Sequence, residues 1–192
     1  MKHAKNTIAV IGGSGKTGKY LIRQLLVHGY RIRALMRNPE RFHIQHHAIE
    51  IIIGDVSNEE NVKDLIRGCD AVISVLGLGV PPSGLSIFSS GTRNILRAMN
   101  SYSVGRYIAI TGLNVNTPSD KKGSATQYAT DWMYKNYPIS TVDRQLEYSL
   151  LAGSTIDWTL VRLPRIEQTG ILNEISVSLT DCPGDKISAT SL

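Results

Sequence analysis

The chain has 192 residues, of which 42% are hydrophobic and 19% charged, a composition that predicts one soluble globular domain with a single core. No apolar run approaches the roughly 20 residues that cross a bilayer, and the two cysteines, Cys69 and Cys182, are too few and too far apart for a disulfide framework or a zinc site. From these two absences we expect a cytoplasmic protein with no membrane partner and no metal. The formal net charge of +5 comes from scattered residues without a basic run, which argues against nucleic-acid partners and leaves a small molecule as the expected partner.

The first predicted element is the most informative: an apolar strand over 8–11 stops at a glycine loop, and a helical pattern begins at once. Glycines at 13, 15 and 18 match the G-x-G-x-x-G spacing of dinucleotide-binding proteins, and Gly12 adds a fourth. The first glycine permits a tight turn, the second lets a pyrophosphate approach, and the third lets helix and strand pack closely. A mononucleotide P-loop is the alternative, but its first glycine would stand where the chain has Val10. The loop residues predicted to hold the pyrophosphate are Gly12, Gly13, Ser14, Gly15, Lys16, Thr17 and Gly18.

The second predicted strand, 31–36, decides which dinucleotide we expect. NAD-dependent proteins usually carry Asp or Glu at this strand end, about 20 residues past the loop, to bind the ribose hydroxyls. This chain carries Arg37 there, and a guanidinium pairs bidentately with a 2′-phosphate that a carboxylate would repel. Lys16 and Arg41 could add positive charge, although Arg37 and Lys16 also fit solvated surface residues. We therefore expect NADP(H) to be preferred over NAD(H).

The rest of the chain alternates strands with helical patterns. In chain order we expect a strand at 49–53, a helix opened by a capping box at 57–60, a strand at 71–76, a helix at 89–99, a strand at 107–110, a polar loop at 114–126, a helix at 144–151, a strand at 158–161, a small extra strand at 175–179 and the opening of a helix at 188–192. Such alternation predicts an α/β fold, a doubly wound parallel sheet of Rossmann type, in one domain over residues 1–192. We expect this domain to lack a final C-terminal helix.

Ligands of such sheets lie outside the carboxyl ends of the strands, so the residues at those ends are further candidates. Asp55 could accept a hydrogen bond from an adenine amino group while Val56 packs on the ring, although Asp55 also fits a plain turn. Leu76 and Gly77 should approach the cofactor's ribose.

The strand at 107–110 ends at Thr111 and Gly112, which should lie near the nicotinamide. Thr111 could hydrogen-bond the nicotinamide or a substrate, and Tyr128 could stack on an acceptor ring, so these two are the candidate catalytic residues. Each of them equally fits an ordinary structural role.

Two pairs of charged residues are expected at the surface. Lys121 and Lys122 lie in the polar loop and fit a solvated pair, with an acidic substrate as the alternative. Arg144 and Glu147 are spaced i, i+3 on a predicted helix, which is typical of a weak surface ion pair.

Four segments together resemble a known family. They are 12–18, 34–39, 54–56 and 157–162. Over about residues 7–188 the chain resembles the atypical short-chain dehydrogenase/reductases, specifically the NmrA-like and biliverdin-IXβ (flavin) reductase-like group. The resemblance implies a one-domain NADP-binding fold with Arg37 on the 2′-phosphate, Asp55 and Val56 at the adenine, and Pro164 with Arg165 beside the nicotinamide.

Two departures from the family pattern bear on the chemistry. Short-chain reductases commonly use Tyr-x-x-x-Lys, and none of the eight tyrosines here has a lysine four residues later. The flavin-reductase relatives carry a serine just after the fifth strand, where this chain has Gly112. Carbonyl reduction needs a proton on oxygen, whereas a conjugated acceptor can take its proton from solvent. We therefore expect an NADPH-dependent oxidoreductase acting on a flavin, a quinone or a similar conjugated acceptor. The alternative is a non-catalytic NADP(H)-sensing regulatory protein of the NmrA-like type, with a protein partner.

Overall fold

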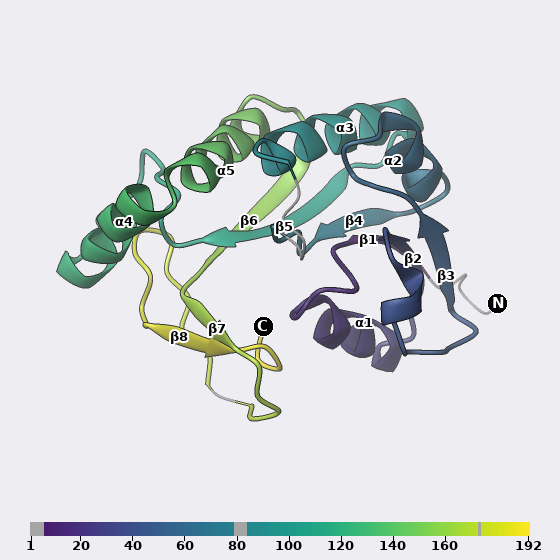
Figure 1. Cartoon of the computed structure of the whole chain (residues 1–192), viewed down its shortest axis with the longest axis horizontal. Helices are drawn as coiled ribbons and strands as arrows, with labels where there is room; N and C mark the ends of the chain where they lie inside the picture. The colour runs from purple at the N-terminus through teal and green to yellow at the C-terminus, as the bar shows by residue number, and fades with distance from the viewer. Residues whose placement is uncertain (1–5, 79–83, 173) are drawn as a thin grey trace.

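A six-stranded parallel sheet lies at the centre of the molecule (Figure 1), with its strands in the order β3-β2-β1-β4-β5-β6. The computed structural model describes residues 6–78, 84–172 and 174–192. The strands of this sheet are β1 (Thr7–Ile11), β2 (Arg31–Met36), β3 (Ile49–Ile53), β4 (Ala71–Ser74), β5 (Arg106–Gly112) and β6 (Asp157–Leu163). The order reverses between β1 and β4, which places a crevice at the carboxyl ends of these two strands. This arrangement confirms the predicted doubly wound sheet of Rossmann type.

Helices cover both faces of the sheet (Figure 1). One face is lined by the helices α2 (Glu59–Ile66), α3 (Ile87–Tyr102) and α5 (Pro138–Ala152), and α1 (Gly18–Val27) lies on the other face. The helix α4 (Ser124–Asn136) continues from α5 beyond the sheet. A 3-10 turn, η1 (Pro39–Arg41), follows β2. Alternate residues of β1 serve two cores. Ala9 and Ile11 join the core under α2 and α3, whereas Ile8 and Val10 join the core under α1.

The helix α4 was not predicted, because its sequence carries no apolar stripe. The residues that it buries are Thr126 and Thr130, one turn apart, and both are polar. The following helix α5 also begins six residues earlier than expected, at Pro138 instead of Arg144. Proline suits this first position, since its missing N–H would have no partner inside the helix.

The extra strand predicted at 175–179 is wrong. These residues have no regular structure, and Val177 and Leu179 are each 84% exposed. Alternating apolar residues form a strand only beside a partner edge, and the described structure instead pairs β7 (Arg165–Glu167) with β8 (Lys186–Ser188). This two-stranded sheet lies apart from the main one (Figure 1).

Two smaller expectations are refined. The helix α2 is capped by Asn58, whose side chain accepts a hydrogen bond from Asn61 N, and Ser57 instead donates to Asp55 Oδ1. At the end of the chain, Leu192 N donates to Ser188 O at 3.2 Å, which forms one turn. None of the helices in the described ranges combines the length and apolarity that a membrane crossing requires.

Candidate cofactor site

The glycine loop turns sharply directly after β1. Gly12 has a φ of +80°, and a Cβ there would stand 2.6 Å from the carbonyl oxygen of Val75. Left-handed backbone at such close range accepts glycine alone. The glycine of the tight turn is therefore Gly12 and not Gly13 as the motif spacing suggested, because Gly13 is outside the left-handed region.

The loop and the start of α1 are packed against each other. A Cβ on Gly18 would overlap the carbonyl oxygen of Gly12 and the backbone of Gly13, so the predicted role of the third glycine is present. Thr17 makes no side-chain cap, which leaves the first N–H groups of α1 for a ligand. These donors and the positive end of the helix dipole favour an anion such as a pyrophosphate.

Two predicted cofactor residues meet at the ends of β2 and β3. Arg37 Nε lies 3.7 Å from Asp55 Oδ2, with both side chains partly exposed. Asp55 Oδ1 accepts hydrogen bonds from the backbone and hydroxyl of Ser57 at 2.8 and 2.6 Å. Val56 is buried against α3, where Gly91 provides the space for it. Its contact with an adenine ring stays a prediction.

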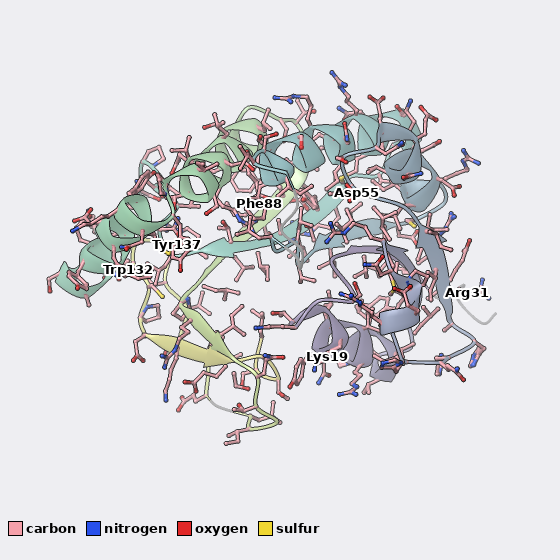
Figure 2. The ribbon with its side chains drawn as sticks, in the orientation of Figure 1. Lys19, Arg31, Asp55, Phe88, Trp132 and Tyr137 are labelled. Atoms are coloured by element: carbon pink, nitrogen blue, oxygen red, sulfur yellow. The ribbon has the colours of Figure 1, made fainter. Side chains whose placement is uncertain are left out.

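The ends of β4 and β5 are held together by Arg144 from α5. Its guanidinium donates to the carbonyl oxygens of Leu76 at 2.5 Å and Ile110 at 3.2 Å, and lies 3.4 Å from the centre of the Phe88 ring. Nη1 also donates to Glu147 at 2.7 Å. Figure 2 marks Phe88 at the start of α3, beside α5. Leu76 is predicted to approach the cofactor, and Arg144 fixes the position of its backbone just after β4.

The expectation of a surface pair between Arg144 and Glu147 is wrong. Glu147 is 1% exposed and also accepts a hydrogen bond from Thr92 at 3.3 Å. The i, i+3 spacing predicts the contact correctly, but it does not reveal that this side of α5 faces the sheet. Beneath the pair lies the fully buried Tyr107, whose pKa is raised by burial and by the neighbouring Glu147 carboxylate.

The same helix caps another helix. Asp143 accepts hydrogen bonds from the backbone N–H groups of Phe88 and Ser89 at 2.8 and 3.3 Å. Asp143 thereby provides acceptors for the first N–H groups of α3, and its carboxylate stabilises the positive end of the helix dipole. Nothing in the sequence pattern distinguished Asp143 or Arg144 from surface residues.

The two candidate catalytic residues lie in different settings. Thr111 is buried, and its Oγ1 has neither a hydrogen-bond partner among the described residues nor contact with solvent. Tyr128 is 72% exposed on α4. None of the described contacts joins Tyr128 to another predicted site residue, so both catalytic roles remain predictions.

Residues beyond β5 form a fixed loop over this edge of the sheet. Asp120 pairs with Arg162 of β6 at 2.7 Å and accepts two hydrogen bonds from Thr117. Lys122, expected in solvent, has a side chain only 5% exposed and donates to Asn116 and Thr130. Desolvation lowers the pKa of Lys122.

The remaining candidates lie around the same edge. Gly77 is exposed, and no atom of the described residues lies within 4 Å of the position of a Cβ there, and Gly112 pairs with Leu163 at the end of β6. Pro164 follows β6 directly, and Arg165 begins β7, where it pairs with Glu167 at 3.0 Å. The fold thus gathers the predicted cofactor residues at the carboxyl ends of the strands.

Solved structures of similar fold include a short-chain dehydrogenase/reductase and an anaerobillin reductase. A short-chain dehydrogenase/reductase of Veillonella parvula in complex with NADP has a TM-score of 0.77 at 18% identity, covering 98% of this chain and 83% of that one. An anaerobillin reductase, ChuY, of Escherichia coli has a TM-score of 0.70 at 15% identity, covering 96% of this chain and 85% of that one. Likeness at these identities shows the fold alone.

Curated relatives are longer proteins. An isoflavone reductase homologue of Nicotiana tabacum is 34% identical over an alignment of 82 residues, and the match covers 38% of this chain and 26% of the relative. A photosystem II assembly factor of Trieres chinensis is 23% identical over an alignment of 180 residues, and the match covers 91% of this chain and 50% of the relative. The chain therefore spans between a quarter and a half of the length of these proteins.

The family match covers the whole described site. The NAD(P)H-binding family matches residues 12–191, from the first glycine of the loop to the last turn. The residues present fit such a cofactor, since Gly12 and Gly18 allow the tight turn and the close packing of loop and helix, and Thr17 leaves the first N–H groups of α1 without a side-chain cap. The chain belongs to the NAD(P)H-binding family of Rossmann-fold proteins.

Proposed function

We propose that this protein is an NADPH-dependent oxidoreductase that reduces a small conjugated acceptor, such as a flavin or a quinone. The observation that carries the proposal is the Arg37 guanidinium at the carboxyl end of β2. Its Nε approaches Asp55 at 3.7 Å, and 39% of its side chain is exposed. A cation open to solvent at this position suits the 2′-phosphate that distinguishes NADP(H) from NAD(H).

Similar proteins support this proposal. The structural neighbour from Veillonella parvula was solved with NADP, and other neighbours and relatives are named as reductases. We also propose that the chain belongs to the narrower NmrA-like and flavin-reductase-like group.

The proposed class of acceptor rests on the proton donors that side chains near the end of β5 could supply. When bound, the reduced nicotinamide supplies a hydride. The chain offers no Tyr-x-x-x-Lys pair to supply a proton, and the hydroxyl of Thr111 is sealed. A conjugated ring can take its proton from solvent, so the protein needs only to hold donor and acceptor in contact. Tyr128, exposed on α4, is the proposed stacking surface.

The test is NADPH oxidation with a panel of flavins, quinones and tetrapyrroles. We expect turnover with at least one of them. Tyr128→Ala should raise the KM for that acceptor, whereas Tyr128→Phe, which keeps the ring, should not. Tight NADPH binding without oxidation by any acceptor would contradict the reductase proposal.

A second candidate is a non-catalytic NADP(H) sensor with a protein partner. The observation that favours it is the lack of an accessible hydroxyl at the end of β5, where Gly112 has none and Thr111 Oγ1 is sealed. A sensor should bind NADPH without turnover and change amide hydrogen exchange in the loop 113–123. Exchange unchanged beyond the glycine loop and β2 would count against it.

A further inference from the structure

Asn114 lies in the turn that follows β5. Val115 N donates to Gly112 O at 3.2 Å, which closes a four-residue turn, and Leu113 N donates to Leu163 O at 2.9 Å, which continues the pairing with β6. This turn folds the Asn114 side chain back over the strand end, where a Cβ on residue 112 would overlap Asn114 Oδ1. Position 112 therefore has to be glycine while Asn114 keeps this conformation.

The carboxamide of Asn114 is nearly buried and has no partner among the residues that the structure describes. The residue is 4% exposed, and its side chain makes no hydrogen bond with a residue in the described ranges. Asn94, which is also buried, donates to Val56 O and Ser57 O at 3.0 and 3.1 Å. A nearly buried amide without such bonds has only solvent or a ligand to satisfy it.

Asn114 also differs from the unpartnered atoms that are sealed inside the protein. The sealed atoms without a hydrogen bond among the described residues are Arg33 Nε, which lies 3.2 Å from Glu50 Oε2, and the hydroxyls of Tyr107 and Thr111. The Asn114 amide is not one of them, so it keeps contact with solvent at the carboxyl edge of the sheet. An unpartnered polar group that a ligand can reach, at the edge where ligands of this fold bind, points to a ligand.

The turn is held rigidly on both sides. Val115 O accepts hydrogen bonds from Arg162 at 3.0 Å and Lys122 at 3.4 Å. The Gln145 amide exchanges two hydrogen bonds with the backbone of Asn116, both at 2.9 Å. A side chain carried by a fixed turn is pre-organised for binding.

We propose that Asn114 binds the carboxamide of the cofactor's nicotinamide ring, an inference that rests on the proposed NADP(H) site. Neighbouring strands lie about 4.8 Å apart, so a cofactor anchored by Arg37 on β2 and by the glycine loop on β1 extends over β4 toward the end of β5. The phosphate groups of the cofactor would then lie at the glycine loop and at Arg37. The neutral carboxamide carries one acceptor and two donors, which complement those of Asn114. The bond fixes which face of the ring meets the acceptor.

The experiment separates the two halves of the cofactor by calorimetry. The ligands are NADP⁺, its 3-acetylpyridine analogue, in which a methyl group replaces the amide nitrogen, and 2′,5′-ADP, which lacks the nicotinamide. The variant Asn114→Leu keeps the shape of the side chain without its polar atoms. We expect about tenfold weaker binding of NADP⁺ and unchanged binding of 2′,5′-ADP. Wild-type protein should bind NADP⁺ more tightly than the 3-acetylpyridine analogue, whereas Asn114→Leu should bind these two ligands equally.

A stability measurement excludes a structural role. Because Asn114→Leu removes an unpartnered polar group, the melting temperature should not fall. Gly112→Ala displaces the Asn114 side chain without replacing it and should weaken NADP⁺ binding in the same way, with 2′,5′-ADP again as the control.

Three results overturn the inference. Unchanged NADP⁺ affinity with a raised KM for the acceptor would assign Asn114 to the acceptor. Equal losses for NADP⁺ and 2′,5′-ADP would make Asn114 a general structural residue of the site. Wild-type protein that binds neither ligand would remove the proposed function as well, and this result is distinct from the other two.

Discussion

Arg144 and Glu147 connect the cofactor edge of the sheet to the helical layer. The guanidinium binds two strand-end carbonyls, stacks on Phe88 and pairs with a carboxylate that solvent does not reach. A buried pair of this kind adds little net stability relative to apolar residues, but losing one partner strands the other charge in the interior. The pair thus makes the geometry of the β4 and β5 ends sensitive to a single substitution.

Glu147→Ala should lower the free energy of unfolding by about 3–5 kcal/mol, because Arg144 then remains buried without its carboxylate. Urea denaturation at neutral pH measures this. Glu60→Ala is the matched control, since it breaks an exposed ion pair with Lys63 on α2, and it should leave the unfolding midpoint unchanged. Similar effects of the two substitutions would contradict the buried-pair account.

Residue roles were predictable where a local motif defines them. The glycine loop and Arg37 stand at fixed distances along the chain, so the sequence alone placed them directly after β1 and β2, and their roles in cofactor binding stay predictions. Arg144 and Asn114 depend on which way a helix and a turn face, and spacing along the chain does not contain that information.

The segment between β5 and β6 is the element where expectation and structure differ most. The polar loop was expected, but the helix α4 and the early start of α5 were not, because Thr126 and Thr130 form the buried side of α4 in place of apolar residues. The loop 113–123 is held by ion pairs from distant elements, chiefly Asp120 with Arg162 of β6. The fixed shape of this loop therefore depends on the charges of these ion-paired side chains.

This dependence predicts a pH effect on stability. Burial tends to raise the pKa of Asp120, but hydrogen bonds from Thr117 and the pair with Arg162 outweigh it and lower this pKa below its ordinary value of 3.8. A carboxyl with a lowered pKa stabilises the folded state above the unfolded pKa, and this contribution is lost as pH falls through the folded pKa.

Denaturation between pH 7 and pH 2 should therefore show stability falling below about pH 4, and Asp120→Asn should remove part of that fall while lowering stability at neutral pH. Asp131→Asn, on the surface of α4, is the control and should follow the wild type. Parallel curves for wild type and Asp120→Asn would contradict the role of the pair.

At the scale of the whole molecule, the alternation of strands and helices was sufficient to predict the sheet and its winding. Parallel pairing needs a crossover after each strand, and right-handed crossovers restrict the possible orders. The β7–β8 sheet could not be predicted, because its strands have three residues each and pair across a long connection. The predicted cofactor residues follow the carboxyl ends of all six strands of the main sheet, whose arrangement Figure 1 shows.

The most direct test of the central claim is calorimetric binding of NADPH and NADH to the wild type, Arg37→Ala and Arg31→Ala. Arg31 begins β2 at the opposite end from Arg37 and lies away from Asp55 (Figure 2), so Arg31→Ala makes the same charge change outside the site and should bind both cofactors like the wild type. Arg37→Ala should weaken NADPH binding by about 1.5–3 kcal/mol, the value of a charge-assisted hydrogen bond, and leave NADH binding nearly unchanged. Equal losses for NADPH and NADH, or none for either, would show that Arg37 does not read the 2′-phosphate.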